Sequence, residues 1–465
     1  MKTPLVLVAC CLVLCSTLLT RATTAGVSST PQNPHAASPS TPPSFECGGE
    51  SCDAVQRGLR AFLDRKPEGL VGNGRSCADC HMPADSFQLS PASVEARFQL
   101  LQWRRRWNPD ADDPLFRPID ADDFRANGDS AGDFSNLRQN GLVRIALPLP
   151  PNVRLIDPTT NTVSNETFVD LWRTVPTVNN VAMTGPDASV PVWPRDPNPT
   201  GGYQLDARVT TLQEQAAGAL LNHAQIQDAP EQLLGDLASF QRVLFTNHRV
   251  RALSDAVRAG TTPLPDPDPR LNALEEQGKA VFVRACSQCH GGPGQSTPTF
   301  PVNRFSNISS QCPRPLDAVT PARFTFAACP ARLVRNARTY EIVLSLPTQG
   351  PTGLIPAGTR VRRTSSDPGR ALQTGFVGGP GPDDDWDKFD VPGLRGIRAT
   401  APYFHNNSAA TLEEVVDHYA QFFKRIEALA APGVVSPAAS TDGVHFDRAP
   451  RPEERAALLA YLRKL

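Results

Sequence analysis

The chain has 465 residues, an apolar content of 40% and a formal net charge of -1 at pH 7. The length favours two or three domains, and the apolar fraction is enough for a hydrophobic core, which excludes a wholly disordered chain. Basic and acidic residues are mixed and form no basic stripe, which argues against a nucleic-acid partner.

The N-terminus has the pattern of an export signal. Met1-Lys2 is a short basic start, Leu5 to Leu19 is apolar, and Thr23-Thr24-Ala25 is a small-residue cleavage pattern. The apolar stretch is too short to favour a membrane span, and a lipoprotein is the weaker alternative. We therefore expect a signal peptide over 1–25, a flexible Ser/Thr/Pro-rich leader over 26–44, and a periplasmic protein without a stable membrane span.

The first half of the chain is expected to be a mainly helical domain over 45–262. An amphipathic helix over Val55–Arg65 precedes a CxxCH motif at Cys77 to His81. The stretch of about 104–165 is rich in Asp, Pro and Asn, and it is expected to be an irregular insertion.

The second half repeats this pattern over 271–465. Alternating prolines predict a linker over 263–270, since proline prevents helix there. An amphipathic helix over Leu271–Ala285 then precedes a second CxxCH motif at Cys286 to His290, and further helices are expected over Leu412–Leu429 and Glu453–Leu465.

Each half also contains a Pro-Leu/Val turn, Pro176-Thr177-Val178 in the first and Pro392-Gly393-Leu394 in the second, followed by a Thr-capped helix with an acidic first turn. The predicted fold class is mainly α, with two duplicated domains and long irregular loops.

Each CxxCH motif predicts a covalently attached c-type haem. The two cysteines can form thioethers with the haem vinyl groups, and the adjacent histidine, His81 or His290, supplies the proximal iron ligand. A thioredoxin-like CxxC would need a βαβ pattern, and a zinc site would need further Cys or His ligands nearby, neither of which the sequence has. The expected cofactors are two haems, with Cys77, Cys80, Cys286 and Cys289 as attachment points.

The other cysteines form two close pairs outside the predicted signal peptide. Cys47 lies near Cys52, and Cys312 lies near Cys329. In an oxidising compartment disulfides are expected, and free buried thiols are the alternative.

The segment FDVPGLRGIRATAPYFHNNSAATLEEVVDHY (Phe389 to Tyr419) resembles the second-domain signature of the bacterial di-haem cytochrome c peroxidases and MauG. Asp367-Pro368-Gly369-Arg370 resembles another element of these families, and Arg173 to Gly185 and Asp206 to Gln225 match more loosely. The resemblance implies two cytochrome c-like haem domains. It also implies that peroxide reacts at the first haem and that electrons pass through the second.

The same resemblance implies roles for individual residues. Tyr419 stands where peroxidases usually have a Met ligand and MauG has Tyr, so it is expected to ligate the second iron; packing in the helix is the alternative. A phenolate favours ferric iron and should lower the potential. An interdomain calcium ion is implied at Asn180, Thr400 and Pro402, oxygen donors of the kind that calcium prefers.

The distal side of the first haem departs from the family pattern. Gln215 matches a distal Gln and His223 lies near it, but Gln225 stands where the families have a Glu that moves protons. Loss of such a group costs about 10²–10⁴-fold in rate. Leu205 replaces a Trp between the haems, which leaves Tyr203 or Trp193 as candidates for an electron path.

Two functions remain open from the sequence. The first is an oxidoreductase of the peroxidase/MauG class that uses hydrogen peroxide or a similar small ligand, with a small redox protein or a partner protein as electron donor. No histidine lies between His81 and His223, so the first haem is expected to be five-coordinate and open. The alternative is that His223 ligates the first iron, or that it replaces the missing Glu as the base. The second is a non-catalytic di-haem electron carrier or redox sensor, which Gln225 and Leu205 favour.

Overall fold

The structure, a computed structural model, describes residues 47–125, 129–184, 187, 202–268, 270–296, 305–312, 329–350, 353–378, 384–429 and 450–465. The predicted signal peptide and leader lie outside these residues, as do His35, Trp193 and His445. Residues Phe45–Leu465 form one compact unit, and its division into two haem domains stays a prediction. No helix in the described part of the chain is long and apolar enough to cross a bilayer.

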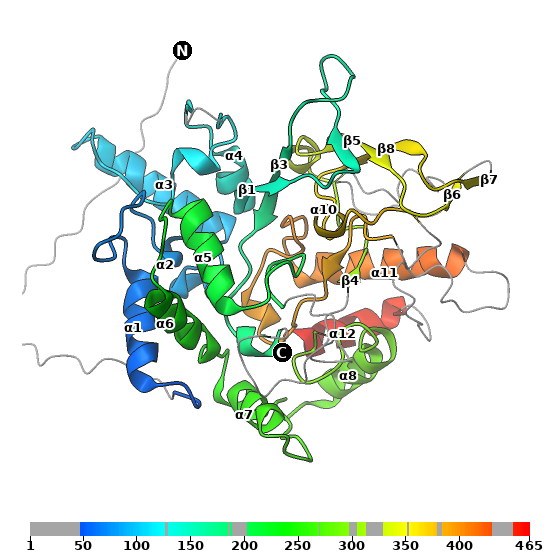
Figure 1. Cartoon of the computed structure of the whole chain (residues 1–465). Coiled ribbons are helices and arrows are strands. Elements are labelled where there is room, and N and C mark those ends of the chain that lie inside the picture. Colours follow the sequence, from blue (N-terminus) through cyan, green and yellow to red (C-terminus); the bar gives the residue numbers. More distant parts are fainter. Residues whose placement is uncertain are drawn as a thin grey trace, which may run out of the picture. The chain divides into compact units, whose positions relative to one another are not determined.

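Helices are the main elements, as the sequence predicts (Figure 1). The four helices named from apolar periodicity are present as α1, α8, α11 and α12, and α12 is preceded by a 3₁₀ turn at Pro452–Glu454. The helices are α1 (Cys52–Leu63), α2 (Cys77–Cys80), α3 (Pro91–Arg105), α4 (Ser135–Asn140), α5 (Leu212–His223), α6 (Glu231–Arg242), α7 (His248–Arg258), α8 (Ala273–Ala285), α9 (Ala331–Val334), α10 (Ala371–Thr374), α11 (Leu412–Leu429) and α12 (Arg455–Leu462).

The described strands form small antiparallel sheets of two or three strands. β2 of the first half pairs with β5 of the second half, so residues far apart in sequence share one sheet. The pairs and orders are β1 (Leu142–Pro148) with β3 (Phe168–Thr174), β2 (Val153–Leu155) with β5 (Arg338–Val343) and β8 (Arg360–Ser365), β4 (Phe305–Ser306) with β9 (Phe389–Asp390), and β6 (Thr348–Gly350) with β7 (Gly353–Ile355).

The segment 104–165 is more regular than the sequence suggests. It contains α4, β1 and β2, so the expected irregular insertion includes regular elements, although turns and irregular structure make up most of its described length. β1 finds its partner β3 outside the segment, and β2 finds β5 nearly two hundred residues later. Pairing of this kind leaves no local sequence signal, because the stabilising partner is distant in the chain.

The internal duplication predicted from the sequence is visible in two matching helix pairs. α1 packs on α6 and α8 packs on α12. A Cβ atom added to Gly58 of α1 would lie 1.9 Å from the Asp236 carbonyl oxygen, and one added to Gly278 of α8 would lie 1.9 Å from that of Ala457. In each pair, therefore, the two helices approach closely because a glycine of one helix contacts the backbone of the other.

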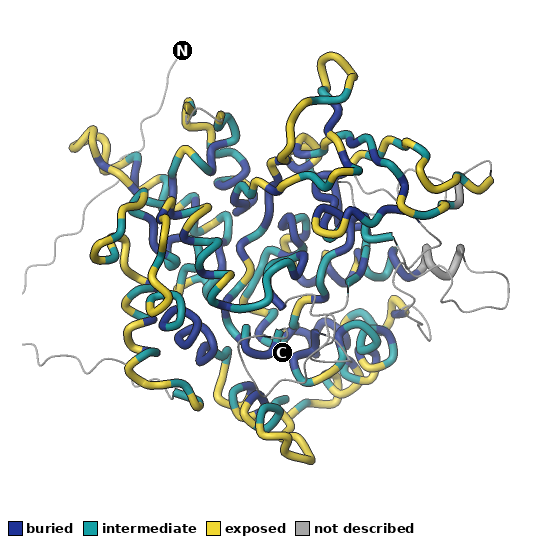
Figure 2. Tube along the Cα trace, viewed as in Figure 1, coloured by how far each residue is buried: buried dark blue, intermediate teal, exposed yellow. Residues whose placement is uncertain are grey.

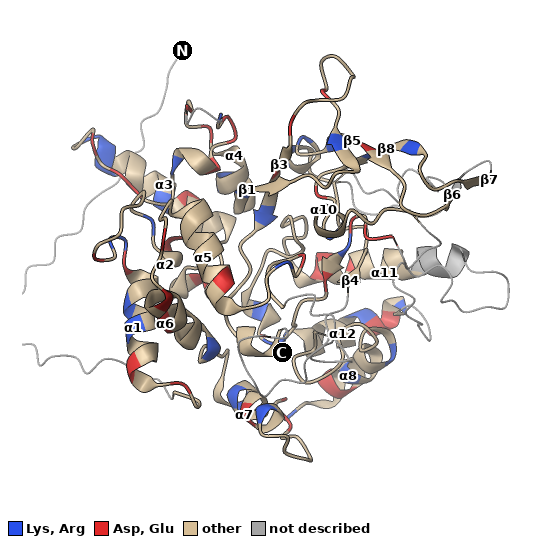
Figure 3. Cartoon of the chain, in the orientation of Figure 1, with Lys and Arg blue, Asp and Glu red and all other residues tan. Residues whose placement is uncertain are grey.

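The buried apolar residues form several clusters. Buried positions are dark blue along the trace in Figure 2. One cluster surrounds the first CxxCH motif and includes Cys77, and another contains Cys286 of the second motif. Acidic and basic residues are interspersed along the chain in Figure 3, in agreement with the absence of a basic stripe in the sequence.

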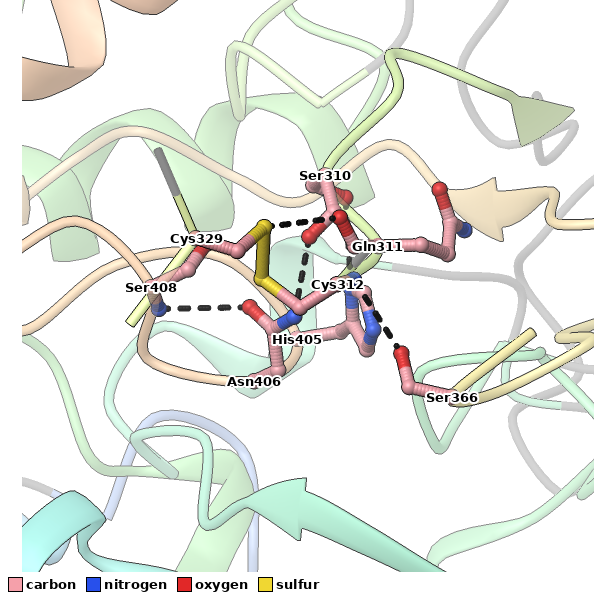
Figure 4. The surroundings of a disulfide bond; sticks show 8 residues. All are labelled: Ser310, Gln311, Cys312, Cys329, Ser366, His405, Asn406 and Ser408. Atoms are coloured by element: carbon pink, nitrogen blue, oxygen red, sulfur yellow. Dashed lines mark hydrogen bonds between the residues drawn. A yellow bond between two sulfur atoms is a disulfide. The ribbon is translucent and has the colours of Figure 1, made fainter. Parts of the chain in front are cut away.

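Both expected disulfides, Cys47–Cys52 and Cys312–Cys329, are formed. Cys312 is fully buried, and the segment before it is hydrogen-bonded to the loop that leads to α11 (Figure 4). Ser310 Oγ lies 3.2 Å from His405 Nδ1, and Asn406 Nδ2 donates to the Ser310 carbonyl at 2.9 Å. The disulfide thus anchors a segment that packs beside the Phe389 to Tyr419 segment.

Candidate functional site

The first CxxCH motif is a single helical turn, α2, held in place by Asp79. The Asp79 carboxylate accepts hydrogen bonds from the Ser76 N–H at the start of the turn and from the guanidinium groups of Arg65 and Arg97. Burial raises the pKa of Asp79, but the hydrogen bonds from Arg65, Ser76 and Arg97 outweigh it, and the pKa is lowered overall. The turn is therefore clamped by a buried carboxylate from within the motif.

His81 follows this turn with one ring nitrogen occupied. Its Nδ1 lies 3.1 Å from the Phe87 carbonyl oxygen, and burial lowers the pKa of His81 to about 4. A neutral imidazole whose Nδ1–H donates to a carbonyl keeps the Nε2 lone pair for a metal, which is the usual arrangement of a metal-binding histidine. The local geometry fits the predicted role of His81 as a proximal ligand.

A cavity joins this motif to α5. Cys77, Cys80 and His81 line it together with Gln215 and His223, so five predicted site residues from separate parts of the sequence share one space. The volume of the cavity is about 160 Å³. Because ligand pockets usually hold about 300–1000 Å³, a haem attached there would extend beyond this cavity, and thioether bonds would fix it despite that exposure.

The distal residues predicted from the resemblance do not all reach the cavity. His223 lines it, and burial lowers the pKa of this histidine, so its imidazole is neutral at pH 7. Gln225 is exposed and is not among the lining residues; it follows the end of α5 with a φ of 57°. The described residues that line the cavity include no carboxylate.

Leu205 and the candidates for an electron path have different locations. Leu205 is half-buried and does not line the cavity; its carbonyl accepts the Asp390 N–H at 2.9 Å. Tyr203, one of the two candidates for an electron path, does line the cavity and is buried. The other candidate, Trp193, lies outside the described residues.

The second CxxCH motif follows α8 and repeats the histidine geometry. His290 is buried, its Nδ1 lies 3.2 Å from the Gln295 carbonyl oxygen, and burial lowers its pKa to about 4. The pKa values of His81 and His290 are further influenced by the carbonyls of Pro176 and Pro392, which belong to the duplicated turns. The two proximal positions are thus built alike.

Tyr419 of α11 packs in the same apolar cluster as Cys286 of the second motif. Its ring contacts the aromatic rings of Phe404, Phe422 and Phe423. This location fits a residue that faces the second haem, and ligation stays a prediction. The preceding residue, His418, is turned to the backbone, with Nε2 2.7 Å from the Ile308 carbonyl.

The protonation of the motif thiols bears on the zinc-binding and thiol-redox alternatives. None of the four motif cysteines is in a disulfide, and burial raises the pKa of Cys77 to about 12, of Cys80 to about 11 and of Cys286 to about 12. Reactive or zinc-binding cysteines need thiolates, which a raised pKa disfavours. Among the described residues, no group of three or more His, Cys, Asp and Glu side chains is placed to hold a metal ion. These properties disfavour the zinc and thiol-redox alternatives.

The implied calcium site does not fit the contacts of Asn180. Its Oδ1 accepts hydrogen bonds from the Thr246 N–H at 3.0 Å and the Thr246 hydroxyl at 3.3 Å. Its Nδ2 donates to the Arg395 carbonyl at 2.9 Å. Nδ2 also donates to the Thr246 hydroxyl at 3.2 Å, so the amide is bonded to protein groups on both sides, and calcium at Asn180, Thr400 and Pro402 stays a prediction from the resemblance.

Sequence reasoning missed the residues that hold the two motifs. The carbonyls of Phe87 and Gln295 accept the histidine N–H groups, and a backbone acceptor has no signature in residue type. Asp79 lies inside the first motif, and an acidic residue there was the available signal for its contacts with Arg65 and Arg97.

Comparisons with known proteins agree with the cytochrome character of the second half. Residues 389–422, which contain the Phe389 to Tyr419 segment, match a family model described as RoxA-like, cytochrome c-like. No curated protein matches the chain by sequence.

Solved structures of di-haem proteins are among those similar to this one. A MauG-like protein associated with microbial copper homeostasis shares 18% identity at a TM-score of 0.42, over 89% of this chain and 88% of that chain. The diheme peroxidase BthA from Burkholderia thailandensis shares 18% identity at a TM-score of 0.39, over 89% and 86% of the two chains. Hydrazine synthase of Kuenenia stuttgartiensis shares 13% identity at a TM-score of 0.35, over 96% and 100%. Similarity this distant does not extend the activities of those proteins to this chain.

Proposed function

We propose that this protein is an exported di-haem c-type cytochrome that acts as a peroxidase-type oxidoreductase. One haem would be attached at Cys77 and Cys80 and the other at Cys286 and Cys289. The observation that carries the proposal is the cavity in which Cys77, Cys80 and His81 meet Gln215 and His223. When bound, a haem with an open coordination position supplies the redox chemistry with peroxide.

The side chains around the first cavity have distinct tasks in this proposal. The Phe87 carbonyl orients His81 through Nδ1, which leaves Nε2 for iron. The Gln215 amide can donate a hydrogen bond to a small ligand in the cavity. The neutral His223 imidazole can accept a proton from that ligand, a task that a carboxylate performs in the resembled families.

The second site would pass electrons rather than bind peroxide. Tyr419, in the same cluster as Cys286, would ligate the second iron and lower its potential. A small periplasmic redox protein, or a residue of a partner protein, would supply the electrons. The mature protein would be periplasmic after removal of residues 1–25.

The proposal is tested in two steps on the purified full-length protein. Pyridine haemochrome analysis should find two covalently bound haems per chain. Peroxide turnover with a reduced cytochrome should then exceed that of free haem, and His223→Leu should lower it by about 10²–10⁴-fold as expected for loss of a proton acceptor. Leu221→Ala, at an exposed position of the same helix, is the matched control and should leave the rate unchanged. A rate equal to that of free haem would reject the peroxidase.

A non-catalytic electron carrier or redox sensor is the second candidate. The absence of a carboxylate among the described cavity-lining residues favours it, because no acid-base group of that type reaches the ligand space. Reversible reduction of both haems without peroxide turnover would support the carrier.

A further inference from the structure

Each of the two predicted proximal histidines is bonded to a backbone carbonyl, but the residues around the two bonds differ. In the first half, Phe87 supplies the carbonyl for His81, and its ring lies 6.0 Å from that of Phe62. The Phe62 ring also lies 5.2 Å from that of Phe240 on α6. Three phenylalanines thus enclose the first histidine–carbonyl pair in an apolar setting.

In the second half, two of the three phenylalanines are replaced by polar residues: Gln295 stands in place of Phe87, and Tyr461 in place of Phe240. Gln295 supplies the carbonyl for His290, and Phe282 lies 5.4 Å from the ring of Tyr461 on α12. The equivalence of Tyr461 and Phe240 follows from the helix pairs. An added Cβ on Gly58 would meet the Cβ of Phe240 at 2.8 Å, and one on Gly278 would meet that of Tyr461 at 2.8 Å. α8 and α12 lie side by side in Figure 1 as α1 and α6 do.

These polar residues form a continuous hydrogen-bonded chain. Gln295 Nε2 donates to the Tyr461 hydroxyl at 3.2 Å, and that hydroxyl donates to Asp268 Oδ2 at 3.1 Å. Gln295 and Tyr461 are only 5% and 2% exposed. Asp268, which belongs to the Pro-rich linker, is itself fixed by Arg395 at 2.9 Å and Lys279 at 3.2 Å.

The chain ends on a strained backbone position. Gln295 has a φ of 53°, a left-handed conformation that residues other than glycine adopt only when their surroundings impose it. Phe87, at the equivalent place in the first half, also has a left-handed φ of 58°, so the turn itself imposes this conformation in both halves. In the second half, the buried bond from the Gln295 side chain to Tyr461 adds a tether to that turn. The chain therefore fixes the carbonyl that accepts the His290 N–H.

We propose that Tyr461 and Gln295 are positioning residues that set the potential of the second haem separately from that of the first. This inference rests on the proposed haem at His290. A well-oriented acceptor for Nδ1–H increases the basicity of a ligating histidine and so favours ferric iron. In the first half, the side chains of Thr177 and Asn179 bond to the Ser86 carbonyl, and the Phe87 side chain has no hydrogen-bonding group that could be tethered. The duplicated halves would therefore acquire unequal haems although their histidine–carbonyl bonds match.

The test is a spectroelectrochemical titration of the two-haem protein carrying Tyr461→Phe. This change keeps the ring packed on Phe282 and removes only the hydroxyl. We expect the ferrous-to-ferric ratio of the second haem at a fixed potential to rise about tenfold, which for one electron corresponds to a midpoint about 59 mV higher. The midpoint of the first haem should not move.

Tyr340→Phe is the matched control, because the Tyr340 hydroxyl is also buried but has no hydrogen-bond partner. It should leave both midpoints unchanged. Gln295→Leu removes the side-chain amide and keeps the backbone carbonyl, so it should reproduce the shift of Tyr461→Phe. It serves as the second test if Tyr461→Phe does not fold.

Two outcomes would overturn the inference. If both midpoints move together, the change acts on the whole protein and not on His290. If neither moves in Tyr461→Phe or Gln295→Leu, the backbone carbonyls hold the His290 ring without help from the Gln295 and Tyr461 side chains. Neither outcome affects the proposed peroxidase, which fails instead if the protein carries no covalent haem or turns over no peroxide.

Discussion

Ala219 and Tyr419 occupy the same position in the two halves of the protein, each eight residues after a threonine that caps its helix. Thr211 accepts the Glu214 N–H at 3.0 Å, and Thr411 accepts the Glu414 N–H at 3.2 Å. Ala219 lines the first cavity, whereas Tyr419 packs with Cys286 of the second motif. A methyl group cannot ligate iron and a phenol can, so this position would make the first proposed haem open and the second closed.

Ala219→Tyr should therefore close the first site. The new phenol would enter the cavity beside His81, fill the ligand position and prevent binding of cyanide or peroxide. Ligand titration followed by the ferric spectrum measures this, with loss of the high-spin signal expected. Gly218→Ala, where an added Cβ meets nothing within 4 Å, should bind ligand like the unmodified protein. A ferric spectrum of the unmodified protein that shows only low-spin haem would contradict the open site itself.

Tyr419→Phe should alter only the second haem. Loss of an anionic ligand should raise its midpoint potential and change its ferric spectrum, because the phenolate favours ferric iron. Tyr403→Phe is a suitable control, since the Tyr403 hydroxyl donates to the Ile397 carbonyl at 3.1 Å. An unchanged potential and spectrum in Tyr419→Phe would leave this residue with a packing role alone.

Gln225→Glu should not restore peroxidase efficiency. The residue is exposed and outside the cavity lining, so a carboxylate there would have no contact with a bound ligand. Gln215→Glu places the same carboxylate on the cavity wall and should change the rate and its pH profile. Steady-state peroxide kinetics of the two variants decide the matter, and a faster Gln225→Glu enzyme would show that this loop does reach the ligand.

Asp79→Ala should destabilise the first haem-binding turn. Arg97 is mostly buried and would lose one of its two carboxylate partners, with Asp113 remaining, whereas Arg65 is half exposed and screened by water. Loss of the buried hydrogen bonds costs about 1–3 kcal/mol, and the exposed Arg65 pair adds little. Urea unfolding measures the loss. Asp53→Ala, at an exposed site in the first turn of α1, should stay within about 0.5 kcal/mol of the unmodified protein.

Asp387 should make the protein less stable as the pH rises. Burial raises the pKa of Asp387 to about 8, and its Oδ2 has no hydrogen-bond partner. The pKa of this carboxyl is higher in the folded than in the unfolded protein, where it is about 4. Its contribution to folding stability is therefore fully present below about pH 4 and is lost as the pH rises towards 8. Asp387→Asn should flatten this part of the stability curve and raise the melting temperature at pH 8. Equal slopes for both proteins between pH 5 and 8 would contradict a buried neutral carboxyl.

The sequence by itself determined the local chemistry of this protein. The CxxCH spacing predicts thioether and histidine positions within one helical turn, and apolar periodicity predicts α1, α8, α11 and α12, because these features depend on residues only a few positions apart. The two remaining cysteine pairs, separated by 5 and 17 residues, also predict their disulfides.

Only the tertiary structure decided which distant residues share a site. It brings Gln215 and His223 to the cavity of Cys77 and leaves Gln225 outside, although these glutamines lie ten positions apart in one segment. It also connects Asp268 to the carbonyl beside His290 through Tyr461. Side-chain direction and backbone partners arise from packing between elements far apart in the chain, and no pattern of neighbouring residues encodes them.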